Sequence, residues 1–343
     1  MKKALFIGGT GTISTAITKQ LSQMTDEWEL YLINRGTRAS IVPGNVKQII
    51  VDINDEKAVA EKIESMHFDC VCDFIGFVKP QLERDYRLFK DKTYQFMYIS
   101  SASAYKKPVG NYMINEGTPL ANPYWQYSRD KIECEDFLMK MHRENGFPVT
   151  IIRPSHTYDE RSVPLAVHGN NGSWQVVKRM LSGKPVIIHG DGSSLWTLTH
   201  NSDFAKGFIG LMGNIHAIGE AFQITSDESV TWNQIYQEIA KCLGVEFKPY
   251  YVPSDFLADV SNYDYTGSLI GDKTCSVVFD NSKLKRAVPG FCATVRFNQG
   301  VRKTIEYILE HPEYQKEDLD FDRWCDNVIE AMDEARTKLC RKL

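Results

Sequence analysis

Two side chains that can hold or transfer a proton, Tyr127 and Lys131, lie four residues apart in the sequence. The segment from 123 to 145 is predicted to be a helix. Residues four apart share one helix face, so the phenol and the ammonium can meet the same ligand. A nearby cation favours the phenolate and lowers a phenol pKa that is about 10 without it. The pair would then serve as an acid and base near neutral pH, although the same spacing also occurs on solvated helix faces.

A serine follows a predicted buried strand at 94–99, in the segment Ser100-Ser101. Four further apolar runs alternate with predicted helices, at 30–33, 46–51, 69–75 and 148–153. This alternation is typical of an α/β fold with a parallel, doubly wound sheet. Ligands of such sheets bind beyond the carboxyl ends of the strands. Ser101 is therefore expected at the edge of the sheet where chemistry takes place.

The first predicted strand leads into a glycine turn. The apolar residues 5–7 are followed directly by Gly8-Gly-Thr-Gly11, and apolar residues recur at helical spacing from Ile13 onward. A strand, a glycine turn and a helix start form a ready site for a dinucleotide pyrophosphate, because free N–H groups and the positive end of the helix dipole point at it. The third position of the pattern is Ser14 and not glycine, which leaves an ordinary strand-to-helix turn as the alternative.

The end of the second predicted strand carries residues that could choose between NAD and NADP. Asn34 stands 20 residues beyond Ser14, where a dinucleotide fold places the side chain that meets the adenosine ribose. Asn34 lacks the charge that would repel a 2′-phosphate, and Arg35 and Arg38 could pair with one, so NADP is slightly favoured over NAD. Both arginines could equally be solvated turn residues. Asp52, after the third strand, could accept from the adenine amino group or flank a helix.

The regular alternation loosens after about 153, where glycine, proline and aromatic residues become more frequent. We therefore predict a nucleotide-binding domain over 1–165, to which later segments return. A smaller α/β lobe with carboxyl-terminal helices is predicted over 166–343 and would bind the substrate. The chain is long enough to bury the cores of both parts.

The composition is that of an ordinary globular protein, with 343 residues of which 43% are hydrophobic and 24% charged, and a net charge of −4. Without a basic stripe or a long apolar run, neither nucleic acid nor a membrane is an expected partner. The eight cysteines include no CxxC pair, and no histidines stand at zinc-ligand spacing, so no metal is expected. Cys70 and Cys72 alternate in an apolar run as buried thiols do, which favours a cytoplasmic protein.

The order of the motifs resembles the extended short-chain dehydrogenase/reductase family, which includes the sugar-nucleotide epimerases and dehydratases. Gly8-Gly-Thr-Gly-Thr-Ile-Ser14 is similar to its cofactor motif, Ser101 to its catalytic serine and Tyr127-x-x-x-Lys131 to its catalytic pair. Arg153-Pro154-Ser155 resembles the segment beside the nicotinamide. Two signatures of the substrate lobe have counterparts at 190–192 and 280–283, so the similarity extends over nearly the whole chain.

This resemblance implies a Rossmann-type fold and a definite chemistry. Tyr127 would take the proton of a substrate hydroxyl while a hydride passes to the nicotinamide, Ser101 would hydrogen-bond the same oxygen, and Lys131 would hold the cofactor ribose. Such chemistry reduces or epimerises a sugar or sugar nucleotide. The resemblance also implies a homodimer, in which the helix of Tyr127 and the preceding helix pack on their symmetry mates.

The predicted site gathers residues from the glycine turn, the strand ends and the substrate lobe. Its catalytic residues are Ser101, Tyr127 and Lys131. The cofactor is expected to contact the last two and, in addition, Gly8, Thr10, Gly11, Thr12, Ile13, Asn34, Arg35, Arg38, Asp52, Ile53, Phe74, Ile75, Gly76, Pro154, Ser155 and His156. The substrate is expected to contact Ser103, Tyr158, Trp174, Trp196 and His200, each of which could instead pack in the core.

Two departures from the family pattern narrow the reaction. The dehydratases carry an acid pair after the catalytic serine or threonine, where this chain has Ala102 and Ser103, so a 4,6-dehydratase is disfavoured. The family also carries an arginine for the nucleotide diphosphate where this chain has Trp196. Tryptophan offers a stacking face and one N–H donor but no charge. The diphosphate is therefore held elsewhere, or the substrate is not a sugar nucleotide.

Two other functions stay open. The chain is also similar to the atypical branch that includes chloroplast stem-loop RNA-binding proteins, which share the Asn34-Arg35-Gly36 ending of the second strand. RNA binding of that kind would weaken steeply with salt, and the intact Ser101, Tyr127 and Lys131 favour an enzyme instead. The other alternative is a sensor that binds NADP(H) without turnover.

Overall fold

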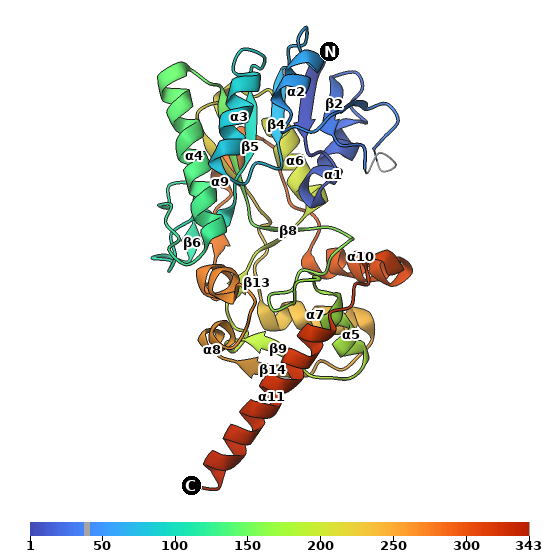
Figure 1. Cartoon of the computed structure of the whole chain (residues 1–343), viewed down its shortest axis with the longest axis vertical. Helices are drawn as coiled ribbons and strands as arrows, with labels where there is room; N and C mark the ends of the chain where they lie inside the picture. The colour runs from blue at the N-terminus through green and yellow to red at the C-terminus, as the bar shows by residue number, and fades with distance from the viewer. Residues whose placement is uncertain (38–41, 343) are drawn as a thin grey trace. The chain divides into compact units, whose positions relative to one another are not determined.

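The computed structural model describes residues 1–37 and 42–342, and the chain divides into two compact units. The first unit contains 1–158, 197–228 and 277–295. The second contains 159–196, 229–276 and the chain from 296 onward. Each unit is thus assembled from three separate stretches of sequence, and Figure 1 shows their helices and strands.

The first unit holds a seven-stranded sheet and the helices that cover it. Its elements are β1 (Lys2–Ile7), α1 (Thr12–Leu21), β2 (Trp28–Asn34), β3 (Lys47–Ile50), α2 (Glu56–Lys62), β4 (Cys70–Asp73), α3 (Lys79–Phe89), β5 (Phe96–Ile99), η2 (Ala102–Ala104), β6 (Met113–Ile114), α4 (Gln126–Asn145), β7 (Val149–Pro154), β8 (His156–Tyr158), β11 (Leu198–His200), α6 (Asn201–Leu211), η3 (Ile215–Ala217), β12 (Ala221–Ile224), β15 (Val278–Phe279) and α9 (Ser282–Ala287). The strand order is β12-β7-β5-β4-β1-β2-β3, and every neighbouring pair is parallel. The predicted parallel, doubly wound sheet is confirmed.

The interior strand β1 is buried on both faces, which explains its continuous apolar run. Because successive side chains point to opposite faces, Ala4 and Phe6 join a core with α1 and α6. Leu5 and Ile7 join a second core with α2, α3 and α4. Helices therefore cover both faces, and the carboxyl ends of the strands form one edge at which the predicted site residues follow β1, β2, β4, β5 and β7.

The second unit is built from helices and two small sheets. Its elements are α5 (Trp174–Leu181), β9 (Val186–His189), β10 (Leu195–Trp196), β13 (Val230–Thr231), α7 (Trp232–Leu243), β14 (Pro249–Val252), α8 (Ser254–Asp259), the π-helix η4 (Thr266–Lys273), α10 (Phe297–Glu310), η5 (Pro312–Tyr314) and α11 (Leu319–Cys340). β9 pairs with β14 in parallel and β10 with β13 antiparallel. No helix in the described part of the chain has the length and apolar character that crossing a membrane requires.

Candidate active site

The glycine turn after β1 requires glycine at its first position. Gly8 has a φ of +84°, a backbone conformation that side chains disfavour. A Cβ atom on Gly8 would also lie 2.4 Å from Cγ2 of Ile75, on the loop that follows β4. The backbone of the glycine turn therefore packs directly against the side chain of Ile75. This is a close-packed cradle of the kind that a dinucleotide needs.

Ser14 explains how this turn works without a third glycine. Its hydroxyl donates to the carbonyl oxygen of Gly8 at 2.7 Å and accepts from the N–H of Gly11 at 2.9 Å. The side chain thus fixes the turn against the first turn of α1, whose leading N–H groups have no partner within the helix. These groups and the dipole of α1 suit a pyrophosphate. The residues present at this turn therefore fit a bound NAD or NADP.

A hollow of about 350 Å³ lies beside the same turn. It is lined by Gly9, Thr10, Thr15, Thr18, Lys19, Val42 and Pro43. Lys19 gives it a single positive charge, and the hydroxyls of Thr15 and Thr18 donate to the carbonyl oxygens of Gly11 and Gly9. An anionic group of the cofactor is the kind of ligand that such a lining suits.

At the end of β2, the Asn34 side chain is engaged in a local turn. Its Oδ1 accepts from the N–H of Gly36 at 2.7 Å, and its Nδ2 donates to Oε1 of Gln48 at 3.1 Å. Arg35 is exposed. The predicted contact Arg38 lies outside the residues that the structure describes.

The catalytic lysine candidate is buried, with only 2% of Lys131 exposed. Its Nζ donates to the carbonyl oxygens of Gly76 at 2.7 Å and Ile99 at 2.8 Å, at the ends of β4 and β5. Among the described residues these contacts use two of its three N–H bonds, and the third is left for a ligand. Burial lowers the pKa of Lys131 to about 8, against the attraction of Asp73, which raises it.

Tyr127 lies one turn before Lys131 in α4, and the lysine Nζ is 5.8 Å from the centre of its ring. The two groups therefore share a helix face, as the spacing predicts. The Tyr127 ring also contacts that of Trp125, with centroids 5.0 Å apart. The phenol is half-buried, so it can still meet a ligand.

Ser101 is held by a chain of hydroxyl groups at the start of η2. Its Oγ lies 2.9 Å from Oγ of Ser103, which in turn accepts from the hydroxyl of Ser128 at 2.8 Å. Nδ2 of Asn122 donates to the Ser103 carbonyl oxygen at 2.9 Å. Because Ser128 follows Tyr127 directly, this chain ties the serine loop to α4. Ser103, a predicted substrate contact, is 5% exposed and occupied by these bonds.

A buried ion pair joins the middle of α4 to the sheet. Arg153, at the end of β7, donates to both carboxylate oxygens of Glu135 at 2.6–3.2 Å, and both side chains are almost fully buried. The guanidinium also lies over the ring of Tyr105, 5.0 Å from its centre. Glu135 stands one turn beyond Lys131. The pair thus fixes α4 against the end of β7.

The predicted contacts beyond β7 lie on two short paired strands of the first unit. β8 and β11 are parallel and set Tyr158 opposite His200, whose rings meet edge to face at 5.3 Å. The hydroxyl of Ser155 lies 3.1 Å from that of Thr199, and His156 is half-buried. The structure therefore brings together two predicted substrate residues that are 42 positions apart in the sequence.

The two predicted tryptophans belong to the second unit. Trp174 begins α5 and is half-buried. Trp196 is 5% exposed and packs on Trp232, with ring centroids 5.4 Å apart. His189 continues this aromatic group at 5.2 Å from Trp232. The core of the lobe thus accounts for the position of Trp196, and its contact with a substrate stays a prediction.

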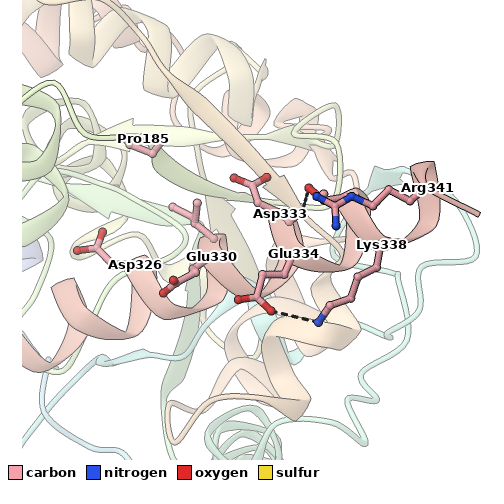
Figure 2. Close-up of a pocket in the computed structure, with 9 residues that line it drawn as sticks. Pro185, Asp326, Glu330, Asp333, Glu334, Lys338 and Arg341 are labelled. Carbon is pink, nitrogen blue, oxygen red and sulfur yellow. Dashed lines mark hydrogen bonds and ion pairs between the residues drawn. The ribbon is translucent and has the colours of Figure 1, made fainter.

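A larger hollow, of about 690 Å³, runs along α11 in the second unit. Figure 2 shows the acidic side chains Asp326, Glu330, Asp333 and Glu334 on one stretch of the helix, followed by Lys338 and Arg341. None of the described site residues lines it. Six of its nine lining residues are charged, whereas small-molecule sites are lined mainly by apolar side chains with a few polar groups.

The sequence motifs missed several residues that shape the site. Ser128 and Glu135 lie within the predicted helix but gave no signal of their own, because their partners Ser103 and Arg153 are distant in the sequence. Asp73 ends a strand in which all four residues are buried, and it accepts from the N–H groups of Ile75 and Gly76. An acid that closes an apolar strand is a signal that could have been used.

The fold is of the doubly wound α/β class, and its glycine turn is of the kind that suits a dinucleotide. Residues 4–225 match the model of the NAD dependent epimerase/dehydratase family, and the chain belongs to that family. The resemblance inferred from the motif order is thereby confirmed. NAD is the cofactor that the family name states. The preference for NADP stays a prediction.

Individual relatives are distant. The 2'-dehydrokanamycin reductase of Streptomyces kanamyceticus is 21% identical over 299 residues, which cover 84% of this chain and 80% of that protein. The chloroplast stem-loop binding protein of 41 kDa b from Arabidopsis thaliana is 25% identical over 71% of this chain, and the match spans 64% of its own length. The structure of UDP-glucuronic acid 4-epimerase from Bacillus cereus, solved with UDP-glucuronic acid and NAD, aligns with a TM-score of 0.70 at 19% identity. That alignment covers 90% of this chain and 99% of the epimerase. At this identity the likeness shows the fold.

Proposed function

We propose that this protein is an NAD(P)-dependent oxidoreductase or epimerase that acts on a hydroxyl of a sugar or sugar derivative, including sugar nucleotides. The observation that carries the proposal is the setting of Lys131, which is buried beside Tyr127 with one N–H bond left after its two carbonyl contacts. Lys131 and Tyr127 lie at the same edge of the sheet as the glycine turn that follows β1. A buried ammonium next to a phenol at such an edge suits hydride-transfer chemistry.

In this proposal three side chains, Ser101, Tyr127 and Lys131, divide the chemistry. Tyr127 removes the proton from the substrate hydroxyl, and the nearby charge of Lys131 favours the phenolate that does so. Ser101, held by Ser103 and Ser128, donates to the same substrate oxygen. The nicotinamide, when bound, supplies the hydride acceptor or donor. The remaining N–H of Lys131 binds the cofactor ribose.

The substrate class is inferred from chemistry and from the named relatives. One matched protein is named a 2'-dehydrokanamycin reductase and another a UDP-glucuronic acid 4-epimerase, which supports a reduction or an epimerisation as the reaction. The dehydratase branch stays disfavoured, because Ala102 and Ser103 supply no acid after Ser101 for the elimination of water. A reaction that ends with hydride transfer or epimerisation needs no such acid.

The test is cofactor exchange and turnover with purified protein. We expect the protein to bind NAD(H) or NADP(H) and to oxidise or reduce a sugar or keto-sugar, and Tyr127→Phe to lose turnover by at least a hundredfold while keeping cofactor affinity. Tyr124→Phe, a change of the same kind at an exposed position, is the control. Turnover that survives in Tyr127→Phe would refute the assigned mechanism, and absence of cofactor binding would refute the proposal as a whole.

RNA binding is the second candidate, favoured by the match to a stem-loop binding protein. It makes a different prediction, since RNA affinity carried by phosphate contacts falls steeply with salt. Binding of a stem-loop RNA that weakens at least tenfold between about 50 and 200 mM salt, together with no turnover, would favour this candidate over the enzyme.

A further inference from the structure

Two aspartates, Asp73 at the end of β4 and Asp85 in α3, are both 0% exposed. Oδ1 of Asp73 accepts from the N–H groups of Ile75 at 2.8 Å and Gly76 at 3.0 Å. Oδ1 of Asp85 accepts from Nε of Arg84 at 2.8 Å. The second oxygen of each carboxyl, Oδ2, is buried without a hydrogen-bond donor from any residue in the described ranges.

The two carboxyl groups lie within hydrogen-bonding reach of each other. Burial, reinforced by the negative charge and the hydrogen bond of Asp73, raises the pKa of Asp85 well above its usual range. Two bare carboxylate oxygens in a dry core would be costly, because neither has a donor and their charges repel. One proton between them removes the repulsion and gives both oxygens a hydrogen bond.

We propose that Asp73 and Asp85 share one proton at neutral pH, as a carboxylate and a carboxylic acid, and that this pair positions Lys131. The shared proton follows from the burial and the contacts of the two side chains alone. The role of Lys131 as the residue that is positioned rests on the proposed function.

The mechanical link runs through Gly76. Asp73 holds the Gly76 N–H, and the Gly76 carbonyl oxygen accepts from Nζ of Lys131 at 2.7 Å and from the hydroxyl of Tyr98 at 3.2 Å. A Cβ atom on Gly76 would lie 2.2 Å from Oδ2 of Asp73. The loop after β4 thus packs on the Asp73 carboxyl, and the Gly76 carbonyl of that loop binds the Lys131 ammonium.

The electrostatic link is the charge of Asp73, which attracts the ammonium of Lys131 and opposes the effect of its burial. The other titratable or charged groups that face these three residues come from β4, α3, β5 and α4, and they are Cys72, Arg84, Tyr98, Cys134 and Glu135. With one proton on the pair, a single negative charge remains close to the lysine.

The same network reaches the loop after β3. Nη1 of Arg84 donates to Oδ1 of Asn54 at 2.7 Å, and the N–H of Asn54 donates to Oδ1 of Asp52 at 2.9 Å. Asp52 is the predicted adenine contact. The acid pair therefore joins the loop expected at one end of the cofactor to the lysine expected at the other.

Infrared spectroscopy tests the proton without any substrate or cofactor. A carboxylic acid has a carbonyl stretch separate from those of carboxylates and amides, so the wild-type protein should show this band at neutral pH. Asp85→Asn should remove the band, because it removes the protonated group. Asp73→Asn should keep the band but shift it, because Asp85 stays buried and its acid then donates to a neutral amide in place of a carboxylate.

Asp91→Asn, the same change at an exposed position before β5, is the matched control and should keep the band. The proposal is overturned if the wild-type protein lacks the band at neutral pH or if the band survives in Asp85→Asn. Absence of the band from the wild-type spectrum overturns the proposal whether or not the variants fold. A band without any NAD(P) binding would support the acid pair and refute the proposed function.

The titration of Lys131, followed by NMR of labelled lysine and assigned through its loss in Lys131→Met, tests the positioning role. The wild-type protein and Asp85→Asn should titrate near pH 8, because a neutral amide replaces a neutral acid. Asp73→Asn should titrate at lower pH, because the attracting charge is gone. Equal shifts in both variants, or no shift in Asp73→Asn, would overturn the proposal.

Discussion

Lys131 shows how one side chain can be both buried and charged. Its Nζ replaces water with two carbonyl oxygens and with the faces of the Phe77 and Tyr98 rings, at 4.8 and 4.9 Å. Such contacts stabilise a cation, yet they only partly replace hydration, and the pKa of Lys131 falls to about 8. The ammonium is therefore held near the pH at which it loses its proton.

This pKa predicts an alkaline limit on activity. Above about pH 8 the folded protein loses the Lys131 charge, so turnover should fall, by about tenfold per pH unit well above the pKa. Lys131 of the unfolded chain stays charged to about pH 10.4, so the unfolded state binds more protons between these values and the contribution of this group to stability rises with pH. Loss of activity in that window is thus separate from unfolding.

A pH–rate profile with parallel circular dichroism checks this prediction. The alkaline limb should be present in Lys140→Met, an exposed position on the same helix. A limb more than two units above pH 8, or one that coincides with unfolding, would contradict the assignment to Lys131.

Arg35 is the described residue whose charge could select NADP(H) over NAD(H). If its exposed guanidinium pairs with a 2′-phosphate, Arg35→Ala should raise the Michaelis constant for NADP(H) about tenfold and leave that for NAD(H) unchanged. Steady-state kinetics with both cofactors measure the ratio, and Lys62→Ala, exposed at the end of α2, is the control. An equal effect on both cofactors would show that Arg35 does not read the phosphate.

At the scale of elements, α4 carries Tyr127, Lys131 and Glu135 on successive turns. The first two face the site, and Glu135 binds Arg153 of β7 inside the protein. The ion pair therefore joins α4 to the carboxyl end of β7. This buried pair fixes the position of α4, and with it the proposed catalytic groups, relative to the end of β7.

Glu135→Gln should accordingly destabilise the protein by about 3 kcal/mol, because it leaves a buried guanidinium without its counter-charge. Urea unfolding followed by circular dichroism measures the loss. Glu144→Gln, near the exposed end of the same helix and 4.0 Å from Lys140, should change stability by less than about 0.5 kcal/mol. Similar values for the two variants would refute a structural role for the buried pair.

For the whole molecule, we propose a homodimer whose interface is formed by α3 and α4. Phe89 and Leu138 are fully buried in the core of the chain itself, whereas Tyr86, Phe137 and Met141 are only half-buried. The rings of Tyr86 and Phe137 meet edge to face at 6.2 Å. These half-buried side chains are the apolar surface left for a second copy of the chain.

Sedimentation at micromolar concentration should therefore give a species of twice 39.2 kDa. Met141→Glu should shift it toward the monomer, because an acid would be buried in the interface. Met113→Glu, at a partly exposed position on β6, should leave it unchanged. A wild-type monomer under these conditions would refute the proposed dimer.

The sequence by itself determined the class of fold and the positions of the main motifs. Apolar runs, helical spacing and the glycine turn are local signals, and the strands and helices follow them closely, as β1 at Lys2–Ile7 and α4 at Gln126–Asn145 illustrate. Tyr127 and Lys131 share a face because the period of a helix is encoded over four residues. Such features need no knowledge of distant contacts.

Only the tertiary structure decided which partners these residues meet. Lys131 contacts a carbonyl 55 residues away, Arg153 pairs with Glu135 across the sheet edge, and Trp196 packs on Trp232 in the lobe. The pairing of Asp73 with Asp85 likewise joins a strand end to a helix. Neither periodicity nor composition records these distances. They arise when separate elements are packed together, and that packing also sets the burial and charge on which the proposed chemistry depends.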